Sequence, residues 1–551
     1  MTKKVSVTIS GAVSLGSYEA GVMYEVLDAI SQHNTWAAQN GLQDQRIEID
    51  VLTGASAGGM TAAILARYML FQGAALTQPY DNPMYNAWVK DIDILGLLQR
   101  GKDEDLTHSI LSSECVETIS KRYLTSTPPL AKPLPLPHPA LSDDGRLMLG
   151  LALSNLNGVD YARQTMSGGQ FTYTRHEDQY IRSLDRSDGD DPESWETIRA
   201  TAVSCGAFPF AFSVQDLIRN ITDFLESPYL VQALWGGRPS TSFCYTDGGV
   251  FQNEPLGMAK NIVERQPNGH LGATNRGYLF IAPQPKASDV LAGFSKANAN
   301  YKETIFHLIS AIMGQSQFQD WAVAEHVNDR IKLLNDRAHE LQQLFAAGTL
   351  NPAQTAPITS ALLPLFFTSA GPAAGALLSA ARSQLGEQYA PEYRSFPNPA
   401  VAAAWLDAVL LLELAADLHE KEEMYIYDFI ADPKRLAGGA LHSFTGFFDV
   451  AYRKHDYDYG RSIAQTQIRY YMSRPGLFSG LHWTPRDIAP INPAYDAVPL
   501  SNVDKGKRQK VYSQLMAAID ALLSELGANW VERKGAESFL IRKYVKQALA
   551  L

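Results

Sequence analysis

The stretch that decides the fold is IEIDVLTGASAGGMTAAILARYML, residues 47–70. Apolar residues occupy every second position from Ile47 to Val51, and this period of two predicts a strand. The small residues 54–59 then predict a sharp turn, and residues 60–70 show the apolar spacing of a helix. A strand, a tight turn and a helix in this order are typical of a sheet whose strands are connected through helices.

The same order of elements occurs at the start of the chain. Apolar residues alternate from Val5 to Ile9, the small residues of SGAVSLG follow at 10–16, and residues 17–30 have helical periodicity. Strand, turn and helix therefore occur twice within 70 residues, which predicts a parallel α/β sheet. Further strands are predicted at residues 147–153, 243–246 and 278–282.

Ser56 lies in Gly54-Ala55-Ser56-Ala57-Gly58, a G-x-S-x-G pattern. A nucleophilic serine on a strand-to-helix turn needs small neighbours, because a side chain on either flank would clash where the backbone doubles back. The following helix also brings the partial positive charge of its N-terminus close to the reacting oxygen. A purely structural turn is the alternative, but the strand before the pattern and the helix after it favour a nucleophile.

Asp247 is the candidate base that a serine nucleophile requires. It ends a predicted strand and is followed by two glycines, Gly248 and Gly249. This pattern holds an acid at the edge of a sheet, with open backbone beside it. The alternative is a hairpin turn built on Asp-Gly.

The loop at residues 10–16 joins the first strand to the first helix. Backbone N–H groups in such a loop converge on an oxygen that gains negative charge during a reaction. The loop is not G-x-G-x-x-G, and no suitably placed acidic residue supports a dinucleotide site.

Three segments together, in this order, resemble the patatin-like phospholipases: SGAVSLGSYEAGV at 10–22, GASAG at 54–58 and DGG at 247–249. Asn253 and Pro255 also fit what usually follows the aspartate, and ATAVSCGAFPFAF at 200–212 resembles the small-residue segment before it. The resemblance spans roughly residues 4–285. It implies a three-layer α/β/α fold with a mostly parallel sheet.

By this resemblance Ser56 is the nucleophile, and Asp247 orients and deprotonates it. The same resemblance assigns the oxyanion hole to the backbone of Gly11, Ala12 and Val13, the nucleophile elbow to Gly54 and Gly58, and a supporting role to Gly248 and Gly249. The implied reaction is hydrolysis of a lipid ester, of the phospholipase A or lysophospholipase type, through an acyl-enzyme that water releases. No metal or organic cofactor is implied.

The oxyanion loop departs from the family pattern, which usually has three glycines followed by Arg or Lys. Here Ala12 and Val13 replace two of the glycines, and Leu15 stands where the basic residue is common. A β-branched residue restricts the approach at Val13, and Leu15 removes one contact to a phospholipid phosphate. The departure therefore bears on the efficiency of the oxyanion hole and on the headgroup preference.

Two other functions stay open. One is an α/β-hydrolase esterase with a Ser-Asp-His triad, for which His442 and His455 occur late enough in the chain. The other is a catalytically silent lipid-binding protein on the same fold, which only the altered oxyanion loop favours.

The composition argues against several classes of protein. Lys and Arg number 47 against 58 Asp and Glu, and this net charge of −11 argues against a nucleic-acid partner. The chain has three cysteines in no CxxC pattern, which argues against a disulfide framework or a zinc site. No apolar run at the start predicts a signal peptide, and none elsewhere predicts a transmembrane helix. We expect a cytoplasmic protein with peripheral contact to membranes.

Two regions are expected: a patatin-like hydrolase domain over 1–290, with a proline-rich loop near 125–142, and a mainly helical C-terminal region over 291–551. Residues 341–381 contain no Asp, Glu, Lys or Arg, which predicts a buried helical hairpin or, alternatively, a lid or lipid-facing surface. The segment HSFTGFFDVAYRKHDYDYGR at 442–461 is expected to be an aromatic packing motif. Alternatively, it lines a pocket with Arg453, His455, Asp456 and Arg461.

Overall fold

The structure is a computed structural model of the 551-residue chain. It describes residues 2–102, 104–105, 107–125, 135–164, 169–224, 230–231, 236–266, 275–283, 294–296, 304, 311, 316, 319–416, 418, 423–439, 443–496, 498, 500–525, 545–546 and 549–551. Most of the predicted proline-rich loop, residues 126–134, lies outside these ranges, as does His442.

The described residues contain one eight-stranded sheet in the order β5-β6-β3-β2-β1-β7-β8, with β4 paired to β3 off this path. Its strands are β1 (Lys3–Ile9), β2 (Ile47–Gly54), β3 (Arg146–Gln164), β4 (Gln170–Asp185), β5 (Gln215–Asn220), β6 (Ser240–Asp247), β7 (Arg276–Ala282) and β8 (Ile426–Ile430). Strands β3, β2, β1, β7 and β8 pair in parallel, whereas β4, β5 and β6 join through antiparallel pairs. The predicted α/β class with a mostly parallel sheet is confirmed.

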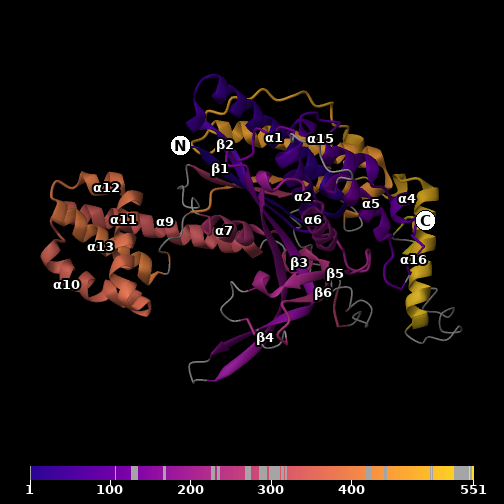
Figure 1. Cartoon of the computed structure of the whole chain (residues 1–551). Coiled ribbons are helices and arrows are strands. Elements are labelled where there is room, and N and C mark those ends of the chain that lie inside the picture. The colour runs from indigo at the N-terminus through magenta and orange to yellow at the C-terminus, as the bar shows by residue number, and fades with distance from the viewer. Residues whose placement is uncertain are drawn as a thin grey trace. The chain divides into compact units, whose positions relative to one another are not determined.

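Helices that contact strands of this sheet include α1 (Gly16–Gln39), α2 (Ser56–Phe71), α6 (Pro192–Cys205), α7 (Leu256–Glu264) and α15 (Val450–Met472) (Figure 1). The same part of the structure also contains α3 (Pro83–Tyr85), α4 (Ile94–Leu97), α5 (Ser113–Leu124) and α16 (Lys505–Glu525). Helices α1 and α2 pack on the sheet through one large apolar core, to which Val5, Val7 and Ile9 of β1 belong. Helix α7 packs against β1, β2 and β3.

Helices α1 and α15 lie side by side, although more than 400 residues separate them in the sequence (Figure 1). Glycines permit this approach: a Cβ on Gly21 would lie 2.1 Å from the Tyr457 carbonyl oxygen, and one on Gly460 would lie 2.2 Å from that of Tyr18. Arg461 donates to Glu25 at 2.7 Å in the same interface, and both side chains are fully buried. The segment after residue 426 is thus an integral part of the sheet-containing unit.

The chain divides into two compact units, and their boundaries differ from the predicted division after residue 290. The first unit comprises residues 1–269, 274–321 and 426–551, and the second comprises 270–273 and 322–425. The physical reason is that β8 pairs with β7 and α15 packs on α1, so the last 126 residues, 426–551, join the first unit.

The second unit is helical. Its elements are most of α9 (Gln319–Ala346), α10 (Pro352–Leu362), the 3-10 segment η9 (Leu363–Ala373), α11 (Ala374–Gln388), α12 (Ala390–Ser395) and α13 (Pro399–Ala415). They enclose a small core around Leu363, Leu385 and Trp405. None of the helices in the described ranges combines the length and the apolar character needed to cross a membrane.

Residues 341–381 are neither wholly buried nor wholly exposed. Leu363 and Ala381 are buried in the core of the second unit. The exposed apolar side chains of this stretch are Leu344, Ile358, Leu362, Leu365, Phe366 and Leu377. The stretch thus contributes both to the core of the second unit and to an exposed apolar surface.

Candidate active site

Ser56 is the first residue of α2, on the turn that follows β2. Its φ is +50°, an uncommon conformation for a residue with a side chain and one that marks functional turns. Added side chains on either flank have no room. A Cβ on Gly54 would lie 2.4 Å from the Gly58 carbonyl oxygen, and one on Gly58 would lie 2.3 Å from that of Ile9. The two glycines of the predicted elbow are thus required by the backbone packing.

Asp247 lies next to Ser56, although the two residues are 191 positions apart in the sequence. The Ser56 hydroxyl donates to Asp247 Oδ2 at 2.6 Å, and the Gly249 N–H donates to Oδ1 at 2.7 Å. The backbone of Asp247 is fixed as well, because its N–H donates to the Ala207 carbonyl at 2.9 Å. Strand β6 and the turn after it therefore hold the carboxylate in a single orientation towards the hydroxyl.

Burial changes the acid–base behaviour of Asp247. Desolvation raises the pKa of its carboxyl to about 7, and the hydrogen bonds from Ser56 and Gly249 offset part of this rise. A carboxylate with a pKa near 7 is a far better proton acceptor than one with the reference pKa of about 3.9. The pair is therefore equipped for proton transfer at neutral pH.

The glycines after Asp247 are also closely packed, Gly248 against backbone and Gly249 against the side chains of Asn253 and Asp247. A Cβ on Gly248 would lie 2.1 Å from the Ala152 carbonyl oxygen, and one on Gly249 would lie 2.9 Å from Asp247 Oδ1. Gly248 lets β6 end against β3, and Gly249 lets its own N–H reach the carboxylate. Larger residues at either position would displace Asp247.

The loop after β1 lies directly against Ser56, because a Cβ on Gly11 would be 2.9 Å from Ser56 Cβ. The Gly11 N–H donates to the Asn253 carbonyl at 3.0 Å and is engaged within the protein. In the described part of the chain, no acceptor pairs with the N–H of Ala12 or Val13. Val13 adopts φ +53°, a conformation that favours glycine. The candidate oxyanion donors are therefore the N–H groups of Ala12 and Val13.

Comparison with known proteins agrees with this geometry. The family model for patatin-like phospholipase matches residues 7–260, which include the end of β1, Ser56 and Asp247. Residues 7–260 form a patatin-like phospholipase domain. Proteins of this family are typically ester hydrolases.

Two curated proteins are similar to this chain. An uncharacterized protein of Sinorhizobium fredii is 24% identical over 368 residues, covering 53% of this chain and 50% of that protein. An uncharacterized membrane protein of Mycobacterium tuberculosis is 26% identical over 316 residues, covering 51% of this chain and 27% of that protein. The chain thus spans half or less of the length of either relative.

The motifs did not indicate that two further residues, Asn253 and Ala207, hold the backbone of Gly11 and Asp247 in place. Asn253 accepts the Gly11 N–H through its carbonyl, and Ala207 accepts the Asp247 N–H through its own. Both residues lie in segments that resemble the family, 200–212 and the residues after the DGG motif. Their roles depend on backbone carbonyls, and a sequence pattern does not report where a carbonyl points.

The polar side chains of α15 for which contacts are given, Arg453, His455, Asp456 and Arg461, have partners other than Ser56 and Asp247. Asp456 accepts the N–H groups of Ala437 and Gly438 and lies 3.1 Å from His455 Nδ1. Arg453 donates to backbone carbonyls, and Arg461 pairs with Glu25. These side chains of α15 serve packing rather than a pocket.

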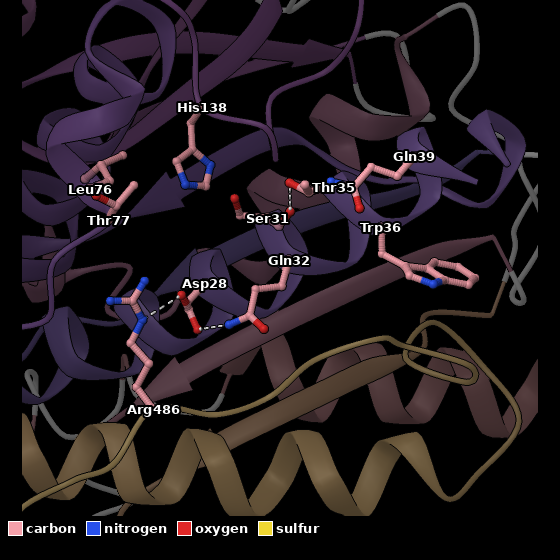
Figure 2. Close-up of a pocket in the computed structure, with 10 residues that line it drawn as sticks. All are labelled: Asp28, Ser31, Gln32, Thr35, Trp36, Gln39, Leu76, Thr77, His138 and Arg486. Atoms are coloured by element: carbon pink, nitrogen blue, oxygen red, sulfur yellow. Dashed lines mark hydrogen bonds and ion pairs between the residues drawn. The ribbon is translucent and has the colours of Figure 1, made fainter. Parts of the chain in front are cut away.

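A pocket of about 330 Å³ lies elsewhere in the first unit, between α1 and the segment containing Arg486 (Figure 2). Asp28 lies 3.3 Å from Arg486 and accepts a hydrogen bond from Gln32 at 2.7 Å. Neither Ser56 nor Asp247 lines this pocket. The pocket is therefore not part of the candidate active site.

Proposed function

We propose that this protein is a serine-dependent lipid acyl hydrolase of the phospholipase A or lysophospholipase type, working with a Ser56–Asp247 dyad. The observation that carries the proposal is the 2.6 Å hydrogen bond from the Ser56 hydroxyl to a buried carboxylate. The patatin-like family supports a lipid ester as the substrate. No cofactor is needed for this chemistry.

In the acylation step, Ser56 Oγ attacks the ester carbonyl carbon while its proton passes to Asp247 Oδ2. The carbonyl oxygen becomes an oxyanion, and we assign its stabilisation to the N–H groups of Ala12 and Val13. When the intermediate collapses, the carbon–oxygen bond to the alcohol breaks and the alcohol takes the proton from Asp247. The products of this step are the free alcohol and an acyl-Ser56 ester.

Deacylation repeats the same steps with water. Asp247 takes a proton from water, and the resulting hydroxide equivalent attacks the acyl carbonyl carbon. The second intermediate expels Ser56 Oγ, which recovers the proton from Asp247, and the fatty acid leaves. A pKa near 7 suits a carboxyl that must accept and return a proton twice in each turnover.

The dyad is favoured over a Ser-Asp-His triad by the contacts of the carboxylate. Among the described residues, the side chain of Asp247 has Ser56 and Gly249 as its hydrogen-bond partners, and no histidine contacts it. His455 lies beside Asp456 and Tyr495 instead. A triad histidine normally contacts both the serine and the acid.

We also propose that the uncharged apolar surface of residues 341–381 contacts the lipid aggregate that supplies the substrate. Leu365 is 60% exposed and Phe366 is 44% exposed, and this stretch has no charged side chain. Exposed apolar side chains without charges suit insertion at the boundary between headgroups and acyl chains.

The test of the proposed function is ester hydrolysis by the wild-type chain and by Ser56→Ala. Loss of the nucleophile is expected to lower kcat by up to about 10⁶-fold without unfolding the protein. Ser142→Ala is the matched control, because Ser142 is also buried but its hydroxyl donates to Glu48 near the beginning of β2, away from Ser56.

Three results would each contradict part of the proposal. Turnover by pure Ser56→Ala protein would end the hydrolase mechanism. A wild-type chain that binds lipid but hydrolyses no ester would favour the silent lipid-binding alternative. A folded His455→Ala protein as inactive as Ser56→Ala would favour a triad.

A further inference from the structure

The candidate oxyanion loop is covered by a segment more than 400 residues away in sequence, at 437–439 and 443–448. Ser14 is fully buried, and its hydroxyl donates to the Ser443 carbonyl. A Cβ on Gly446 would lie 2.5 Å from Ser14 Oγ, and one on Gly438 would lie 2.9 Å from Leu15 Cδ2. The two glycines thus allow the segment to lie directly on Ser14 and Leu15.

Helix α15 fixes this covering segment from its other side. The Asp456 carboxylate accepts the N–H groups of Ala437 and Gly438, each at 2.8 Å. Arg453 donates through Nη1 to the carbonyls of Gly446 at 3.0 Å and Phe447 at 3.1 Å. Buried charged groups with such partners give strong, directional hydrogen bonds. The segment is therefore held at both ends by side chains of one helix.

The loop needs such support because of its own sequence. Val13 adopts φ +53° immediately before Ser14, and a β-branched residue occupies this region only when its surroundings impose it. Leu15 is fully buried against Gly438. A glycine-rich loop adopts such conformations at no steric cost, whereas this loop must be held in place from outside.

We propose that residues 437–439 and 443–448, anchored by Asp456 and Arg453 of α15, position the oxyanion loop, and that the Ser14 hydroxyl is the link between them. Ser14 is a positioning residue: it acts through the N–H groups of Ala12 and Val13. The inference rests on the proposed hydrolase function and deepens it. It accounts for the replacement of two loop glycines and for the polar residues of α15.

The first test compares Ser14→Ala with the wild-type chain. We expect kcat to fall by about 10- to 100-fold, while KM changes little. This fall should not exceed the fall in kcat that removal of one direct oxyanion donor causes. The affinity for a trifluoromethyl ketone, whose adduct with a serine carries the same oxyanion, should fall in parallel.

The second test uses Gly446→Ala, whose new methyl group would displace the Ser14 side chain. Its loss of kcat should be similar to that of Ser14→Ala, and the double variant should lose far less than the product of the two, because both act through one contact. Ser142→Ala should keep the wild-type kcat and ketone affinity.

The outcomes separate this inference from the proposed function. If Ser56→Ala is inactive but Ser14→Ala keeps wild-type kcat and ketone affinity, the inference is wrong and the hydrolase proposal stands. The inference would also be wrong if the Ser14→Ala protein loses activity only in proportion to its unfolded fraction, with unchanged ketone affinity per folded molecule. If Ser56→Ala retains turnover, the proposed function itself fails.

Discussion

The turn that holds Ser56 and the helices formed by residues 352–388 differ in how closely other atoms surround their backbone. At the turn, a Cβ added to Gly54 or Gly58 would meet backbone atoms at 2.3–2.4 Å. In the helical unit, nothing lies within 4 Å of a Cβ added to Gly371 or Gly375. Close packing thus requires glycine at positions 54 and 58 of the turn, whereas packing does not require glycine at positions 371 and 375.

The same difference extends to the larger side chains of the two regions. Ser56 and Asp247 are buried and have fixed partners, whereas Leu365 and Phe366 expose apolar atoms to solvent. Buried polar groups with full hydrogen bonding indicate a site that is complete within the chain. Exposed apolar groups indicate a surface whose partner lies outside it.

The largest effect is expected at the buried carboxylate. Asp247→Asn removes the base and should lower kcat/KM by about 10⁴-fold or more. In the wild-type chain, kcat/KM should fall about tenfold per pH unit below pH 7 and level off above it, because the pKa of Asp247 is raised to about 7 and only the deprotonated carboxylate accepts the proton.

A histidine base would make kcat/KM fall at a similar pH. The temperature dependence of the pH midpoint distinguishes a histidine base from Asp247. The enthalpy of ionisation is small for a carboxyl and large for an imidazolium. The pH midpoint of the fall in kcat/KM should therefore move by only about 0.1 pH unit when the assay temperature is raised from about 15 to about 35 °C. A midpoint that shifts strongly with temperature would indicate a histidine base.

A pair of glycine substitutions sharpens the comparison directly. Gly58→Ala forces a methyl group against the Ile9 and Ser10 carbonyls and should destabilise the fold by about 1–3 kcal/mol while abolishing most activity. Gly375→Ala, on a helix with open space, should leave activity unchanged and raise stability by up to about 1 kcal/mol. Thermal unfolding and ester hydrolysis measure both effects, and a tolerated Gly58→Ala would refute the close packing of the turn.

The smallest effect is expected at the exposed apolar surface. Leu365→Ser combined with Phe366→Ser should weaken binding to phosphatidylcholine vesicles by about 10-fold, since part of the apolar area buried at the lipid is lost. Leu333→Ser is the matched control, because Leu333 of α9 is 55% exposed but lies outside residues 341–381. Co-sedimentation with the vesicles measures the binding of each variant. Equal losses in both variants, or none in the double variant, would remove the lipid surface from the account.

Alternating and helical spacing of apolar residues predicted the elements that form around Ser56. β1, β2 and α2 follow the alternation and helical spacing of residues 5–9 and 47–70. The strand β8 was not predicted, because it pairs with β7, more than 140 residues earlier in the chain. The return of residues 426–551 to the first unit depends on the same distant pairing.

The candidate site shows the same division between local and distant information. G-x-S-x-G and D-G-G indicated Ser56 and Asp247 because small residues at fixed spacing report a tight backbone turn. The raised pKa of Asp247 was not foreseeable, since it depends on burial by elements from several parts of the chain. The contact of Ser14 with Ser443 joins the first and the last parts of the sequence, and no motif spans that distance.

The most direct test of the central claim is labelling by an organophosphonate, which forms a stable adduct with an activated serine. Intact mass and peptide mapping of the wild-type chain should show one adduct, on Ser56, formed much faster than in Asp247→Asn, and no adduct in Ser56→Ala. An adduct on another serine, or equal labelling of wild type and Asp247→Asn, would contradict the assignment of Ser56 as a nucleophile activated by Asp247.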